Sequence, residues 1–133
     1  MLKVVVDTNV LVSALTHDGK PRRLVLRLLK DHKVISSSRM MAELADVLSR
    51  DKFNVSSSQV DRFLESLVDA CKFVPDHSRF KIISEDPDDD VVLNVAYSAR
   101  ADYVVTGDKH LLALYRFRNA RILTVGEMLE TLV

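Results

Sequence analysis

Short apolar runs rich in β-branched residues alternate along the chain with segments whose apolar residues recur at helical spacing. Four of these runs predict strands: residues 2–6, 34–36, 101–106 and 121–123. Residues 73–75 and 80–83 are shorter extended pieces. Because the main runs lack the polar alternation of half-exposed strands, we expect them to be central strands of a parallel sheet, buried on both faces.

The helical segments lie between these runs. They are predicted at residues 10–15, 22–30, 40–48, 58–71 and 91–99, with short helices after Asp108 and after Thr124. Asp86 and Pro87 are typical of a helix cap and a first helical position, because proline there gives up no hydrogen bond. Thr124 and Glu127 have the spacing of a capping box before the last helix.

This alternation of strands and helices predicts an α/β fold. We expect a three-layer α/β/α sandwich, in which helices cover both faces of a central parallel sheet through right-handed crossovers. No internal repeat, linker or low-complexity tract interrupts the pattern. Residues 1–133 are therefore expected to form one domain.

Composition narrows the function classes. Nineteen basic and nineteen acidic residues cancel, so no global field favours nucleic acid or an anionic membrane, and a polyanion would need a local patch. Cys71 is the only cysteine, which excludes an internal disulfide and a cysteine zinc site, and its place on an apolar stripe predicts a core residue. Without a leader or an apolar run of membrane-spanning length, we expect a cytoplasmic protein with no membrane partner.

Acidic residues collect where predicted strands end and helices begin. Asp7 follows the first strand, Asp108 follows the 101–106 run, and residues 86–90 hold four aspartates in five positions. Glu43 lies on the predicted helix 40–48, which Ser37 or Ser38 can cap. Strand ends and helix starts face the same crevice in an open parallel sheet, so these groups are expected to meet there.

Each acid also has a plainer interpretation. Asp7 has the position of a helix N-cap, although Thr8 and Asn9 can fill that role, and Glu43 resembles an exposed helical glutamate. Together, however, Asp7, Glu43, one or both of Asp89 and Asp90, and Asp108 would repel one another unless a cation lay among them.

An all-oxygen ligand set favours Mg²⁺ or Mn²⁺. The four histidines do not pair at ligand spacing and are expected to be solvent-exposed or supporting residues: His17, His32, His77 and His110. A divalent cation in a carboxylate cleft is typical of phosphodiester hydrolysis. No Ser-His-Asp set, glycine-rich phosphate loop or dinucleotide fingerprint offers another chemistry.

Residues 19–39 are the only lopsided basic stretch, with seven Lys or Arg against the single acid Asp31. Such a run is either a solvated helix face or a rim that contacts phosphates. The candidate RNA-contacting residues are Arg22, Arg23, Arg39 and, beyond this stretch, Lys109.

Four motifs in order resemble the PIN-domain family over nearly the whole chain. They are VVVDTN at residues 4–9, SRMMAEL at residues 38–44 with SRDKF at 49–53, DPDDD at residues 86–90, and VTGDK at residues 105–109. The branch looks like the VapC-type toxins of prokaryotic toxin–antitoxin pairs.

The resemblance implies a Mg²⁺- or Mn²⁺-dependent endoribonuclease that cleaves single-stranded RNA. It implies Asp7, Glu43, the third-motif aspartate and Asp108 as metal ligands, with Asn9 and Thr106 as supporting polar groups. In the family pattern a small helix residue lies two turns after the third ligand. Counting back seven positions from Ala96 favours Asp89 over Asp90, and both remain candidates. It also implies a cognate antitoxin and a homodimer.

Two alternatives belong to other classes. A phospho-aspartate phosphatase needs a second aspartate two residues after the first, where Asn9 stands, and a receiver domain needs an aspartate at the end of its middle strand, near Ser36. A catalytically idle RNA- or protein-binding module predicts the loss of one acid, and none is lost.

Overall fold

The structure is a computed structural model that describes residues 1–50, 53–77, 79–81 and 87–133. Three sequence predictions fall outside these ranges: the cap at Asp86, the part of the extended piece at residues 82–83, and residues 51–52 of the second motif.

Six strands of the described residues form one sheet in the order β3-β2-β1-β4-β6-β5. Their bounds are β1 Lys3–Val6, β2 Lys33–Ser36, β3 Lys72–Phe73, β4 Tyr103–Val105, β5 Arg116–Phe117 and β6 Ala120–Leu123. All neighbouring strands run parallel except β5, which pairs antiparallel with β6. The α/β prediction is confirmed, and the antiparallel hairpin at one edge is an addition that the sequence analysis did not predict.

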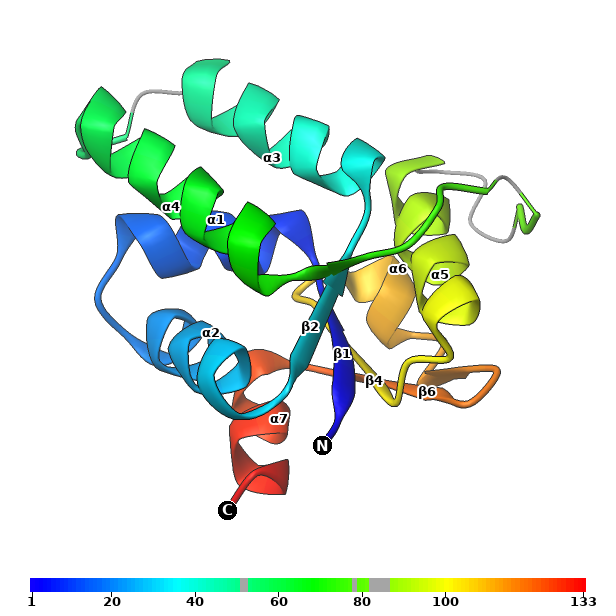
Figure 1. Ribbon diagram of the computed structural model, residues 1–133. Coiled ribbons are helices and arrows are strands. Elements are labelled where there is room, and N and C mark those ends of the chain that lie inside the picture. Colours follow the sequence, from blue (N-terminus) through cyan, green and yellow to red (C-terminus); the bar gives the residue numbers. More distant parts are fainter. Residues whose placement is uncertain (51–52, 78, 82–86) are drawn as a thin grey trace.

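In the described ranges, seven helices connect and cover the strands (Figure 1). Their bounds are α1 Thr8–Thr16, α2 Lys20–Asp31, α3 Ser38–Arg50, α4 Ser57–Ala70, α5 Pro87–Ala99, α6 Lys109–Leu112 and α7 Val125–Thr131. The capping box of Thr124 and Glu127 is present, and Ser37 caps α3 through a 3.2 Å bond from the Met40 amide to its hydroxyl.

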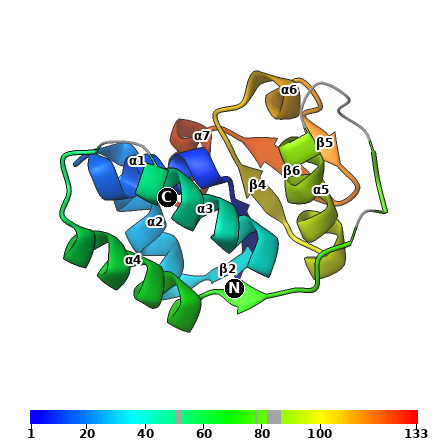
Figure 2. The ribbon, with the colours of Figure 1, turned by 90° about the horizontal axis from the view of Figure 1, so that it is seen from above.

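Side-chain alternation along the strands divides the core into two layers. Val4 and Val6 of β1 face a cluster formed with α1, α2, α3, α4 and α7, whereas Val5 faces a cluster formed mainly with α5 and α6. Seen from above, α5 and α6 lie on one side of the sheet and the other helices on the opposite side (Figure 2). This is the three-layer arrangement that the alternation predicted, because the central strands β1, β2 and β4 are mostly buried on both faces, whereas the short edge strands β3 and β5 are more exposed.

Two details concern predictions made from the sequence. Cys71 ends α4 and is half-buried against the core, and burial raises the pKa of its thiol to about 11, so the thiol stays protonated at neutral pH. Within the described residues, no helix is both long enough and apolar enough to cross a membrane.

Candidate metal centre

Asp7 sits where β1 gives way to α1, at the centre of the sheet. Its side chain is 8% exposed, and although it holds the N-cap position of α1, it makes no capping hydrogen bond to that helix. Instead, its Oδ2 accepts a 2.7 Å hydrogen bond from the Thr106 hydroxyl. The carboxylate of Asp7 therefore does not serve as the helix cap.

Thr106 connects two acidic positions at the ends of neighbouring strands. Its side chain is fully buried, and besides donating to Asp7, its Oγ1 accepts a 2.9 Å bond from the Asp108 amide. One oxygen of Asp108, Oδ1, accepts from the amides of His110 at 2.8 Å and Leu111 at 3.2 Å. Because β1 and β4 are paired with Val6 beside Val105, the turns that follow them are held side by side.

The start of α5 brings further acids to this edge, because the helix runs back along the sheet from the carboxyl ends of the strands. Asp88, Asp89 and Asp90 lie in its first turn, where the helix dipole favours negative charge. Asp89 is 5% exposed, Asp90 is half-buried and Asp88 is exposed. The burial distinguishes Asp89 as the inward-facing member of the three.

Asp89, Asp108 and His110 each place one potential ligand atom within 4.8 Å of the others. His110 Nδ1 lies 4.0 Å from Asp89 Oδ2 and 3.8 Å from Asp108 Oδ1. Two carboxylates and an imidazole at these separations fit a divalent cation that accepts oxygen and nitrogen ligands. Among the residues that the structure describes, this is the one such group of three.

His110 was not expected to take part in this group, because the sequence analysis sought histidines paired with one another. The sequence feature that indicates a role for His110 is its position close to a strand-end acid. His110 follows the strand-end acid Asp108 by two residues and belongs to α6, so the chain returns its ring toward the start of α5. A histidine two residues after a predicted carboxylate ligand is thus informative even without a second histidine.

Glu43 and Asn9 lie on other helices. Glu43 is half-buried on α3, which packs against α5, and it is not a member of the three-residue group found among the described residues. Asn9 is exposed on α1 and borders a cavity of about 320 Å³ together with Thr106, Gly107 and Gly126.

The four candidate RNA-contacting residues have different settings. Arg22 is half-buried, and its guanidinium donates 2.9 Å hydrogen bonds to the carbonyls of Ala14 and Leu15, which ties α2 to the end of α1. Three others are exposed: Arg23, Arg39 and Lys109. Arg22 thus has a structural use that the sequence analysis did not predict.

Comparisons with known proteins bear on this arrangement. A family model described as PIN domain matches residues 3–110. An uncharacterized protein of Methanocaldococcus jannaschii is 29% identical over 118 residues, which cover 85% of this chain and 75% of that protein.

Two solved structures share the fold. One is the crystal structure of VapBC2 from Rickettsia felis bound to a DNA fragment from the promoter, with a TM-score of 0.65, 18% identity, and coverage of 92% of this chain and 98% of that one. The other is PAE2754 from Pyrobaculum aerophilum, with a TM-score of 0.63, 18% identity, and coverage of 98% and 89%.

Proposed function

Since this chain belongs to the PIN-domain family, we propose that it is a metal-dependent endoribonuclease that cleaves single-stranded RNA. PIN domains are generally nucleases. The observation that carries the proposal is the group formed by Asp89, Asp108 and His110, whose ligand atoms lie within 4.8 Å of one another at the edge where Asp7 is buried.

Asp7, Glu43, Asp89 and Asp108 would hold Mg²⁺ or Mn²⁺, with Asp90 as the alternative to Asp89 and His110 as an added nitrogen donor. A bound divalent cation would supply a water of lowered pKa and neutralise charge on the scissile phosphate. Manganese accepts an imidazole ligand more readily than magnesium does, so the nearness of His110 favours Mn²⁺ activity at least equal to that with Mg²⁺.

The protein's own residues fix the acids before substrate arrives. Thr106 orients the Asp7 carboxylate through its hydroxyl, and two backbone amides hold one oxygen of Asp108. Such orientation limits reorganisation when charge develops on the phosphate. Asn9 would support the site from α1, while Arg23, Arg39 and Lys109 would contact the RNA phosphates.

We further propose that the protein acts in the cytoplasm as the toxin of a toxin–antitoxin pair. Its fold similarity to the VapBC2 structure supports this role. A cognate antitoxin and a homodimer remain predictions. An idle binding module, in contrast, would bind RNA without cutting it.

The test is to incubate purified protein with single-stranded RNA in Mg²⁺, in Mn²⁺ and in EDTA, alongside calorimetric titration of Mn²⁺ into the protein without RNA. We expect cleavage with either metal, loss of cleavage in EDTA, and Mn²⁺ binding that is weakened in Asp108→Asn. Equal cleavage in EDTA would refute metal dependence, and metal binding without any cleavage would favour the idle module.

A further inference from the structure

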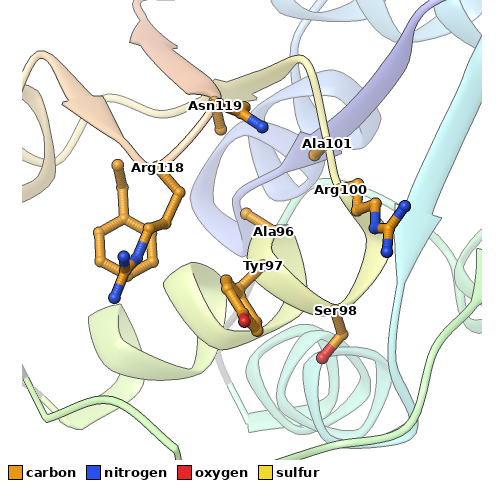
Figure 3. A pocket seen from close by; sticks show the side chains of 9 residues that line it. Ala96, Tyr97, Ser98, Arg100, Ala101, Arg118 and Asn119 are labelled. Atoms are coloured by element: carbon orange, nitrogen blue, oxygen red, sulfur yellow. The ribbon is translucent and has the colours of Figure 1, made fainter.

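A second cavity lies at the opposite end of α5 from the acidic cluster. It has a volume of about 600 Å³ and opens between the last turn of α5 and the β5–β6 hairpin. Figure 3 shows Tyr97 and Ser98 on the helix, Arg100 just past its end, and Arg118 on the hairpin facing the helix. None of the residues lining this cavity was identified as functional from the sequence.

Aromatic rings and guanidinium groups stack at its border. Phe80 packs edge-to-face on Tyr97 and on Phe117, with ring centroids 4.9 and 5.2 Å apart. The Arg118 Cζ lies 5.0 Å from the centre of the Phe80 ring, and the Arg79 Cζ lies 5.1 Å from that of Tyr97. A guanidinium stacked on a ring still presents its other face and its N–H edge to a ligand.

Two of these arginines occupy backbone positions that favour glycine. Arg100 has φ 53° at the end of α5, and Arg118 has φ 56° at the first position of a two-residue hairpin turn. Glycine is the usual residue in both settings because it lacks a Cβ. Residues with strained backbones of this kind cluster at binding sites. The backbone of these turns does not require arginine, so we infer that the two arginines are present for what their side chains bind.

The charge of the region is one-sided. Among the described residues, no acid lines this cavity or the adjoining one of about 500 Å³, which is bordered by His77, Arg79 and Tyr97. Within the ranges that the structure describes, Arg79, Arg100 and Arg118 make no ion pair. Three guanidinium groups that have no acidic partner among the described residues, together with an exposed aromatic ring, fit a ligand that carries both anionic groups and flat rings.

We propose that this cavity, here called the arginine–aromatic pocket, binds a distal segment of single-stranded RNA. A base would stack on Tyr97 and the Arg118 guanidinium, and phosphates would contact Arg100 and Arg118. The inference rests on the proposed function, because the same RNA strand would reach the acidic cluster. Asp89 and Tyr97 are eight residues apart on α5, about 12 Å at ~1.5 Å per residue. That span matches about four stacked nucleotides at ~3.4 Å each.

The experiment measures RNA binding in EDTA, so that no cleavage occurs. A fluorescently labelled 12-nucleotide RNA of mixed sequence is titrated with wild type, with the double variant Arg100→Gly/Arg118→Gly, and with a control double variant. The control, Arg62→Ala/Lys72→Ala, removes the same number of positive charges from exposed positions on α4 and β3. Glycine suits the backbone at both positions, so the double variant should melt at or above the wild-type temperature. We expect its Kd to rise about tenfold and its log–log salt slope to fall by about 1.4, the value for two lost phosphate contacts on a single strand.

The outcomes of these titrations distinguish RNA binding by the pocket from protein binding and from no binding. A Kd and salt slope equal to those of wild type in the double variant would overturn the pocket. A labelled acidic peptide that contains tyrosine is titrated with the same proteins. If the double variant lost more affinity for this peptide than for the RNA, the pocket would be reassigned to a protein partner, which would also overturn the proposal. RNA binding that depends on the pocket in a protein that never cuts RNA would refute the proposed function alone.

Discussion

The two ends of α5 carry opposite chemistry on one rigid element. At its start, Asp89 meets Asp108 and His110 beside the carboxyl ends of the parallel strands. At its end, Arg100 and Arg118 border a cavity whose described lining contains no acid. One end is suited to hold cations and the other to hold anions, although the sequence as a whole is electrically neutral.

The two ends also differ in how the fold builds them. Regular structure positions the acids, because strand ends and helix starts always meet at one edge of a parallel sheet. Irregular structure positions the arginines, through a helix terminus and a hairpin turn whose φ angles are positive. The topology of the sheet therefore determines where the acids lie. The residues at one helix terminus and one hairpin turn determine where the arginine–aromatic pocket lies.

The largest expected effect comes from substituting Asp7 or Asp108. Either substitution should disable the acidic cluster at the start of α5 without unfolding the protein. Changing a residue that merely orients a metal ligand costs roughly 10–100-fold in affinity or activity. Asp7→Asn or Asp108→Asn, if these are ligands, should therefore reduce RNA cleavage by about 100-fold or more. Loss of negative charge relieves repulsion, so both variants should melt at or above the wild-type temperature without metal.

The control is Asp61→Asn, an exposed acid on α4, which should leave both cleavage and melting unchanged. Asparagine caps a helix nearly as well as aspartate, so α6 should persist in Asp108→Asn. Full cleavage by Asp7→Asn would show that its buried carboxylate only anchors Thr106.

The second-largest expected effect is a difference in RNA cleavage between variants of the neighbouring acids Asp89 and Asp90. Asp89 is 5% exposed and Asp90 is half-buried, about 100° further round the helix. Asp89→Asn should match Asp7→Asn in its loss of cleavage, whereas Asp90→Asn should retain at least about a third of wild-type activity, since its carboxylate points elsewhere. Cleavage rates of the two variants in Mg²⁺ and in Mn²⁺ are the measurement, and equal damage would reject only the choice of Asp89.

These predictions rest on positions that the sequence already indicated, and the reason is physical. Strand β1 and the start of α5 are specified by local signals, an unbroken β-branched run and a proline in the first turn. The hairpin of Arg118 carries no such signal, because its turn lacks the glycine or asparagine expected at the first position. Its strand β5 has only two residues and depends on pairing with β6. The pocket therefore could not be predicted before the fold was known.

A third prediction tests His110, which the search for paired histidines in the sequence did not identify as a ligand. His110 lies 3.8 and 4.0 Å from two carboxylates, so as a metal ligand or supporting donor it should matter less than the acids themselves. His110→Ala should weaken Mn²⁺ binding by about tenfold, in the range for partners of metal ligands, and weaken Mg²⁺ binding less. Calorimetric titration of each metal is the measurement, with His17→Ala, an exposed histidine, as the matched control. Equal losses for the two metals would argue that the ring contributes packing instead of a nitrogen ligand.

The smallest effect concerns the backbone at the basic end. A residue other than glycine costs roughly 1–2 kcal/mol in the left-handed region, and glycine loses roughly 0.4–1 kcal/mol through its freer unfolded chain. Arg100→Gly and Arg118→Gly should each leave the free energy of unfolding unchanged or raise it by up to about 1 kcal/mol, as measured by urea denaturation. Arg62→Gly, within the regular helix α4, should instead lower it by roughly 0.5–1 kcal/mol. A clear loss of stability at Arg100 and Arg118 would mean that the guanidinium groups hold the turns together, and their positions would then need no RNA to explain them.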